Sequence, residues 1–300
     1  MVISSKSYSR LVLGTAQLGM SYGAANKTGK PGFSEAENIV RNAWRNNIVE
    51  FDTAQGYGHS EKTLGDIFEN LDIQSDVKVI SKIDTALDHS DRAVLRHSIT
   101  RSLEYLKCTS LYGLMLHKES LLEDWDRGLG AFLDQLIEKG IVQHVGVSVY
   151  STEKAVQALT TEGVTIIQIP ANVLDRRFEN AGIFELADRL NKTVYVRSIF
   201  LQGLLLMDID KLPAVLKFAT PVLQRFKQLS RELRMTRHSI AIGYVKLAYP
   251  NAKILFGSET ALQVEENTKI WGTDFPNSMV SVIRDTFSNV DEKLVNPSLW

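Results

Sequence analysis

Four titratable residues stand at or just after predicted strand ends, in a pattern that suits proton transfer. Asp52 ends one apolar run and Tyr57 follows it in a glycine-flanked loop, while Lys82 and His117 end the next two apolar runs. A lysine cation paired with a carboxylate can lower the pKa of a phenol, and a histidine can hold a substrate oxygen beside it. Alone, each residue has an ordinary explanation as a solvated charge, a surface aromatic or a buried histidine. Together they predict an acid centred on Tyr57.

The elements that position these residues follow from hydrophobic periodicity, because short apolar runs alternate with amphipathic stretches of helical length. The runs predict eight strands at about residues 11–15, 49–52, 77–82, 111–117, 142–148, 166–169, 194–197 and 254–256. The amphipathic stretches predict helices at about 34–47, 60–70, 92–107, 121–139, 152–160, 179–191, 213–233, 238–249, 260–271 and 277–287. Ser34, three residues before Glu37, has the spacing of a capping box and predicts the start of the first helix.

Strands separated by helices pair in parallel, because a return to the same edge of a sheet needs a crossover. Eight such units favour a closed (β/α)8 barrel of the TIM type, an α/β fold forming a single domain over residues 1–300. An open doubly wound sheet is the competitor, but the first strand lacks the full G-x-G-x-x-G loop of such folds. No linker and no repeat of 20–50 residues divides the chain. Sites in these barrels lie at the carboxyl ends of the strands, where the four residues above stand.

Composition points to a small-molecule partner. The 34 lysines and arginines nearly balance the 35 aspartates and glutamates, for a net charge of −1, so no basic surface for nucleic acid is expected. The apolar segment 199–207 is interrupted by Gln202-Gly203 and is too short to span a membrane. The single Cys108, and the lack of an apolar signal core in residues 1–6, predict a reducing cytoplasm. Nothing in the sequence specifies an oligomeric state.

Three segments closely resemble the signatures of the aldo-keto reductase family. They are Leu13-Gly14-Thr15-Ala16-Gln17-Leu18-Gly19, then Phe51-Asp52-Thr53-Ala54 followed by Tyr57-Gly58-His59-Ser60-Glu61, and Gly140-Ile141-Val142-Gln143-His144-Val145-Gly146-Val147-Ser148. The resemblance covers about residues 11–271 and leaves 272–300 as a C-terminal helix and tail. It implies a (β/α)8 barrel that reduces carbonyl compounds with a nicotinamide cofactor and without a metal. The pair His59 and Glu61 has no second pair of ligands at suitable spacing, so we expect no metal site.

The resemblance assigns the catalytic tetrad to Asp52, Tyr57, Lys82 and His117. It implies hydride transfer from the nicotinamide to a substrate carbonyl, with Tyr57 donating the proton to the developing alkoxide. Lys82, held by Asp52, would make Tyr57 acidic enough to act. His117 would orient the carbonyl.

The resemblance also places cofactor contacts along the chain. Ser148 and Gln168 would hold the carboxamide, Gly14 and Thr15 would lie near the nicotinamide ribose, Gly203 and Leu204 would follow the pyrophosphate, and Asp52 belongs to the same set. Three positions depart from the family pattern. Val149 replaces a common asparagine, Ala171 replaces a tyrosine, and Arg197 replaces an aromatic residue that often stacks on the nicotinamide.

The predicted adenosine end departs further. Family members that bind the 2′-phosphate of NADP place cations where this chain has Gly257-Ser258-Glu259 and Gln263. The family implies NADPH, but Gly257, Glu259 and Gln263 suggest tolerance of NADH, unless Lys253 and Lys269 reach in from neighbouring turns. Glu266 and Asn267 are predicted adenine partners, with a solvated helix face as the alternative.

The leading interpretation is a reductase of an aldehyde, ketone or sugar-like carbonyl. The alternative is a nicotinamide-binding regulatory or scaffold protein with little turnover, which the changes at Val149, Ala171 and Arg197 motivate. A hydrolase or isomerase using Asp52 and Glu61 would explain neither Tyr57 nor Lys82. The segment Asp175-Arg176-Arg177 is expected to form local ion pairs. The alternative is that its arginines bind a carboxylate or phosphate of the substrate.

Overall fold

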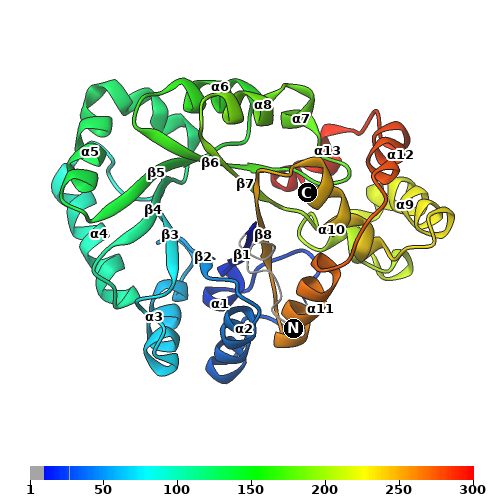
Figure 1. The fold of residues 1–300 in the computed structure, drawn as a ribbon, viewed down its shortest axis with the longest axis horizontal. Helices are drawn as coiled ribbons and strands as arrows, with labels where there is room; N and C mark the ends of the chain where they lie inside the picture. The colour runs from blue at the N-terminus through cyan, green and yellow to red at the C-terminus, as the bar shows by residue number, and fades with distance from the viewer. Residues whose placement is uncertain (1–9, 27) are drawn as a thin grey trace.

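Eight parallel strands close into a barrel in the computed structural model, which describes residues 10–26 and 28–300 (Figure 1). The strands are β1 (Leu11–Gly14), β2 (Glu50–Asp52), β3 (Lys78–Ile83), β4 (Leu111–Leu116), β5 (Val142–Ser148), β6 (Val164–Pro170), β7 (Thr193–Arg197) and β8 (Lys253–Gly257). Each strand pairs with its neighbours in the sequence, and β1 pairs with β8 to close the ring. The predicted single-domain (β/α)8 fold is confirmed.

Helices surround the barrel on its outside (Figure 1). They are α1 (Ala16–Gly19), α2 (Phe33–Arg45), α3 (Ser60–Leu71), α4 (Arg92–Leu106), α5 (Gly130–Glu138), α6 (Thr152–Thr160), α7 (Arg177–Asn180), α8 (Ile183–Arg189), α9 (Thr220–Glu232), α10 (Arg237–Ala248), α11 (Ala261–Trp271), α12 (Ser278–Thr286) and α13 (Glu292–Val295). Helices α2 and α11 pack together beside the β1–β8 pair, so helices from the two ends of the barrel sequence cover the place where the barrel closes.

Side chains fill the barrel in layers, because alternate residues of each strand point inward. Val12, Ile80, Met115, Ile166 and Tyr195 form the apolar middle of this interior. A larger apolar layer, which includes the buried Phe51 and Phe68 in edge contact at 5.0 Å, lies between the strands and the helices. The inward residue two places after each middle residue therefore reaches the carboxyl-end rim.

The amino-end floor of the barrel is polar. The Glu50 carboxylate is buried, accepts a hydrogen bond from the Tyr195 hydroxyl at 2.9 Å, and pairs with the Lys253 ammonium at 2.6 Å. These two contacts satisfy a buried charge, as burial requires. They also place Lys253 at the end of the barrel opposite the rim, so the suggestion that Lys253 reaches the adenosine end is wrong.

Three predicted helices differ from the structure. Residues 121–139 divide into a 3-10 turn at Glu119–Asp124, a π turn at Trp125–Leu129 and α5, because Gly128 has a φ of +96° and is not helical. Residues 179–191 divide at Gly182, whose φ is +69°. Residues 213–233 begin as a 3-10 turn at Ala214–Ala219 before α9.

The predicted capping box at Ser34 is also wrong. The cap of α2 is Gly32, and the helix already begins at Phe33, so Ser34 lies inside its first turn. Glu37 does not reach back to a cap, because its carboxylate pairs with Arg41 one turn later.

Candidate active site

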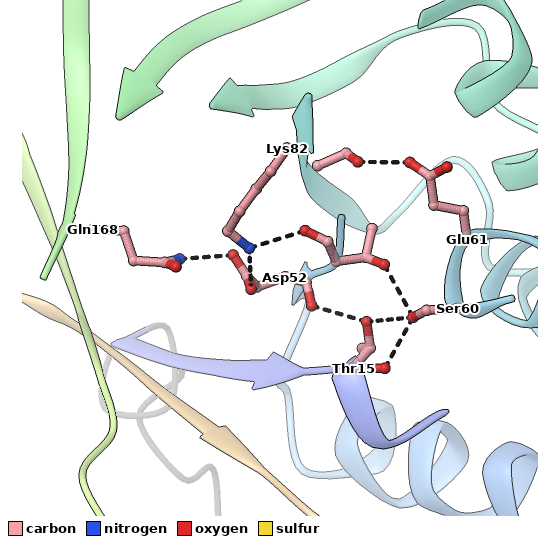
Figure 2. Close-up of polar contacts among 8 residues, drawn as sticks. Thr15, Asp52, Ser60, Glu61, Lys82 and Gln168 are labelled. Atoms are coloured by element: carbon pink, nitrogen blue, oxygen red, sulfur yellow. Dashed lines mark hydrogen bonds and ion pairs between the residues drawn. The ribbon is translucent and has the colours of Figure 1, made fainter. Parts of the chain in front are cut away.

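The carboxyl-end rim holds a buried ion pair between β2 and β3. The Lys82 Nζ donates to Asp52 Oδ1 at 2.6 Å, and the Gln168 amide donates to Asp52 Oδ2 at 2.7 Å (Figure 2). Lys82 also donates to the Thr53 carbonyl at 2.9 Å. Asp52 is 2% exposed and Lys82 is fully enclosed. Both oxygens of the Asp52 carboxylate therefore have hydrogen-bond donors, and the buried pair is a fixed polar base beneath the cavity at the rim.

Hydroxyl groups tie the loop after β2 to the start of α1 and α3. The Thr15 hydroxyl donates to the Asp52 carbonyl at 2.8 Å, the Ser60 hydroxyl donates to the Thr15 carbonyl at 2.9 Å, and Thr53 donates to Ser60 at 3.0 Å (Figure 2). All of these atoms are buried. Residues 53–60, which carry Tyr57, are thus held at both ends.

Glu61 has a structural position. Its two oxygens accept hydrogen bonds from Ser81 at 2.6 Å and Ser102 at 3.1 Å, which link α3 to β3 and α4. It does not contact Asp52, and Asp52 is bound to Lys82. These contacts contradict an acid–base pair of Asp52 and Glu61.

Tyr57 and His117 meet above the buried pair. Their rings make an edge contact at a centroid distance of 5.7 Å, and the Lys82 ammonium lies 5.1 Å from the Tyr57 ring centre. Burial, followed by the charges of Lys82 and Arg197, lowers the pKa of His117 to about 4. His117 is therefore neutral at pH 7 and can donate or accept a hydrogen bond without carrying charge.

The expected acidification of Tyr57 is wrong for this structure. Burial, and then the negative charge of Asp52, raise the pKa of Tyr57 well above that of a free phenol, while Arg197 opposes the shift. Asp52, paired with Lys82 at 2.6 Å, opposes the effect of the lysine charge on Tyr57, so the pKa of the phenol stays raised. Tyr57 is therefore protonated at neutral pH, and it can give its proton only to a base stronger than its own tyrosinate.

A cavity of about 490 Å³ runs from Tyr57 across β1 and β8 to α11. Its walls include most of the predicted cofactor residues, namely Gly14, Thr15, Asp52, Gln168, Arg197, Gly203, Gly257, Ser258, Glu259, Gln263, Glu266 and Asn267. The rim residue Tyr57 lines the same cavity. Most of the residues predicted from sequence thus line one continuous space.

Four predicted residues lie off this wall. Lys82 and His117 lie against the Tyr57 ring. Ser148 is buried and pairs with Gln168 between β5 and β6. Leu204, predicted to follow the pyrophosphate, does not line the cavity. Its side chain is fully buried in the apolar core, and its backbone N–H donates to the Leu201 carbonyl at 3.0 Å. Its neighbours Leu206 and Met207 line the cavity instead.

The residues present fit a dinucleotide. The volume lies in the range of small-molecule sites. The Ser258 hydroxyl is buried on the wall without a hydrogen-bond partner among the described residues. A Cβ on Gly203 would lie 2.4 Å from that of Ala25, so only glycine lets these two loops meet over the cavity. Ser258 lies just before the start of α11, and a helix start with a free donor and close backbone approach suits the phosphates of a dinucleotide.

The predicted adenosine end is more acidic than basic. Glu259 is half-buried, burial raises its pKa, and a hydrogen bond with Thr28 opposes that shift. Gln263 is engaged through its side-chain oxygen, which accepts from the Glu259 backbone N–H at 2.7 Å. Lys269 is exposed and is not part of the cavity wall. Lys211 also lines the cavity, and its ammonium lies 3.7 Å from the Asp208 carboxylate.

Several wall residues were missed by the sequence analysis. His238 lines the cavity, and its Nε2 lies 2.6 Å from Asn267 Oδ1, so it orients the predicted adenine partner. Arg237 beside it donates to the carbonyls of Leu205, Leu206 and Met207 at 3.0, 3.1 and 2.8 Å, which fixes the loop after β7. Tyr22 and Gln202 also line the cavity. The available signal was a helix that begins with an arginine and a histidine and comes after a long glycine-containing loop in the chain.

The charged segment after β6 braces the rim, as the first of its two interpretations predicts. Arg177 donates through Nε and Nη2 to the two oxygens of the fully buried Asp175 carboxylate, at 2.9 Å each. Arg176 donates to the Phe287 carbonyl at 2.9 Å, which ties β6 to the end of α12. Neither arginine lines the cavity.

Within residues 10–26 and 28–300, no cluster of three or more histidine, cysteine, aspartate or glutamate side chains is arranged to hold a metal ion. In the same part of the chain, no helix combines the length and apolar character needed to cross a membrane. The predicted signal-free segment 1–6 lies outside the described residues.

Comparison with known proteins is consistent with this architecture. The family model described as the aldo/keto reductase family matches residues 10–286. The holo form of aldo-keto reductase AKR11C1 from Bacillus halodurans is 19% identical, with 96% of this chain and 95% of that chain covered at a TM-score of 0.74. A thermostable aldo-keto reductase, Tm1743, in complex with the inhibitor epalrestat is 18% identical, with 95% of each chain covered at a TM-score of 0.69. A sequence search of curated proteins found no match.

Proposed function

We propose that this chain, which belongs to the aldo/keto reductase family, reduces a small carbonyl compound to an alcohol with Tyr57 as the proton donor. Family and fold together support a nicotinamide-dependent oxidoreductase in general. The observation that carries the finer proposal is the buried Asp52–Lys82 pair beneath Tyr57, with neutral His117 against the same phenol ring. A protein that merely binds a nucleotide has no need of this arrangement.

In the proposed reaction, a bound reduced nicotinamide supplies the hydride that adds to the carbonyl carbon. Tyr57 gives its hydroxyl proton to the carbonyl oxygen as negative charge develops there, so the product is an alcohol. The tyrosinate then recovers a proton from water. The raised pKa of Tyr57 keeps the proton on the phenol until an alkoxide, which is a stronger base, is formed.

The side chains next to Tyr57 orient the carbonyl and stabilise the tyrosinate. His117, with its pKa lowered to about 4, offers a neutral ring N–H to the carbonyl oxygen beside Tyr57. Lys82 lies 5.1 Å from the centre of the Tyr57 ring, so its charge stabilises the tyrosinate that proton transfer leaves. Asp52 and Gln168 hold Lys82 and the cavity floor in one geometry.

We further propose that the cofactor site accepts NADH. Ser258 and the loop around Gly203 would hold the phosphates, while Asn267, positioned by His238, would contact the adenine. Glu259 would accept a hydrogen bond from a free ribose 2′-hydroxyl and repel a 2′-phosphate. The Glu259→Lys variant should raise the ratio of the dissociation constants for NADH and NADPH by about tenfold. An unmoved ratio would mean that other residues read the 2′-position.

Titration with NADH and with NADPH, followed by tryptophan fluorescence, tests the proposal directly. We expect saturable quenching with at least one of the two, and consumption of that cofactor when a panel of aldehydes, ketones and sugar-like carbonyls is added. Binding without turnover on any carbonyl would favour a regulatory or scaffold protein. Binding of neither at millimolar concentration would refute the cofactor site altogether.

A further inference from the structure

Arg197, the last residue of β7, has a polar edge that the protein leaves unused. Its guanidinium carbon lies 4.3 Å from the centre of the Tyr150 ring, and its Nη1 donates to the Ser198 hydroxyl at 3.3 Å. Its Nε and Nη2 are enclosed and have no acceptor among the described residues, and Arg197 lines the cavity. Buried donors without partners are costly, so a group that satisfies both stabilises the site.

The charge of Arg197 acts on the reaction centre. Its guanidinium is one of the groups that lower the pKa of His117, and it opposes the rise in the pKa of Tyr57. The carboxylate of Asp52 on the same wall is already bound at both oxygens by Lys82 and Gln168. Arg197 is therefore an uncompensated cation close to the point where the carbonyl must be held.

The same chain shows what such an edge binds. Arg177 uses the equivalent pair of atoms, Nε and Nη2, to hold both oxygens of the Asp175 carboxylate at 2.9 Å each. This two-point contact is the geometry in which guanidinium groups select carboxylates. In Arg197 the guanidinium lies over the Tyr150 ring, and the same two atoms, Nε and Nη2, are enclosed at the cavity wall without an acceptor among the described residues.

We propose that Arg197 binds a carboxylate of the substrate, so that the preferred substrates are oxo acids rather than neutral aldehydes or ketones. This inference rests on the proposed carbonyl reduction, because it places the acid group beside the reacting carbonyl. The bound carboxylate neutralises the guanidinium and accepts from its two free donors. Arg197 thereby fixes which end of the substrate approaches Tyr57.

Binding of an unreactive acid tests the site without any turnover. Benzoate and benzamide are titrated by calorimetry into the protein alone and into the protein loaded with NADH or NADPH. We expect benzoate to bind at least about tenfold more tightly than benzamide. Arg197→Met should bring the two within about twofold, and Arg197→Lys should keep part of the preference because it retains charge but loses the fork. Arg189→Met, an exposed residue of α8, is the matched loss of one charge and should leave the preference intact.

Kinetics then separate this inference from the function on which it rests. The 2-, 3- and 4-formylbenzoates are compared with their neutral amides, and at least one acid should exceed its amide about tenfold in kcat/KM, with the excess lost in Arg197→Met. Reduction of acids and amides at equal rates would overturn the role of Arg197 while the reductase stands. Absence of all turnover would refute the proposed reductase activity. The preference for benzoate over benzamide would still show whether Arg197 binds a carboxylate. Weaker NADH or NADPH binding in Arg197→Met, with an unchanged acid preference, would assign Arg197 to a cofactor phosphate and overturn the inference.

Discussion

Substitution of Lys82 by methionine tests how the buried charge of Asp52 is held. Methionine has nearly the length of the lysine stem and no charge, so the variant keeps the packing and removes the cation. The Asp52 carboxylate, 2% exposed, would retain the Gln168 amide as its side-chain donor. The Thr53 carbonyl would lose the hydrogen bond that it accepts from Lys82 at 2.9 Å.

The expected cost follows from these contacts. Removing one partner of a buried ion pair destabilises a protein by roughly 3–5 kcal/mol, because the other charge stays buried and unpaired. The hydrogen bond from Gln168 at 2.7 Å partly compensates, while the lost bond to Thr53 adds about 1 kcal/mol. We therefore expect a loss of about 4 kcal/mol in the free energy of unfolding. Adding Asp52→Asn removes the orphaned charge, so the double variant should be about 1–2 kcal/mol more stable than Lys82→Met alone.

Equilibrium urea unfolding, followed by tryptophan fluorescence, measures these differences. Lys154→Met is the control, because Lys154 pairs with the largely exposed Glu123 at 3.2 Å and should contribute less than about 1 kcal/mol. A loss below about 1 kcal/mol in Lys82→Met would refute the reasoning. A double variant less stable than the single one would show that the charge of Asp52 is held by something other than Lys82.

Two further predictions concern His117 and Ser60. The pKa of His117 is lowered to about 4, and a lowered pKa contributes stability that is present above the unfolded value and is lost as the pH falls toward the folded value. Between pH 7 and pH 5 the wild type should lose about 2 kcal/mol that His117→Asn does not lose, and equal losses in urea unfolding would contradict this. Ser60→Ala leaves the Thr53 hydroxyl and the Thr15 carbonyl without their buried partner, so we expect a loss of roughly 1–3 kcal/mol, against a much smaller one for the exposed Ser281→Ala. Equal losses in the two serine variants would show that the hydroxyl network does not hold the loop.

The position of the site in the fold was predictable because strand periodicity and barrel geometry act together. Asp52 stands two places after Glu50 and Arg197 two places after Tyr195, so both side chains of each pair face the barrel interior, and the later residue of each pair lies nearer the rim. The same spacing brings Lys82 and Gln168 to that rim. The residue types at the strand ends were therefore enough to predict which polar side chains meet at the rim.

The parts that failed depend on contacts between segments far apart in the sequence. The engagement of Gln168 with Asp52, 116 positions away, and the burial that raises the pKa of Tyr57 cannot be read from local patterns. Leu204 belongs to the core because the loop after β7 turns its side chain inward. Loop residues such as Tyr22 and Lys211 reach the cavity through tertiary packing that no periodicity encodes.

The central claim is that Tyr57 transfers the proton, and Tyr57→Phe tests it most directly. The variant keeps the ring that touches His117 and removes the hydroxyl alone. We predict that the dissociation constant of the cofactor stays within about twofold while kcat/KM for carbonyl reduction falls by at least about 10²-fold. Turnover at the wild-type rate with cofactor bound would contradict the claim and assign proton transfer to another group.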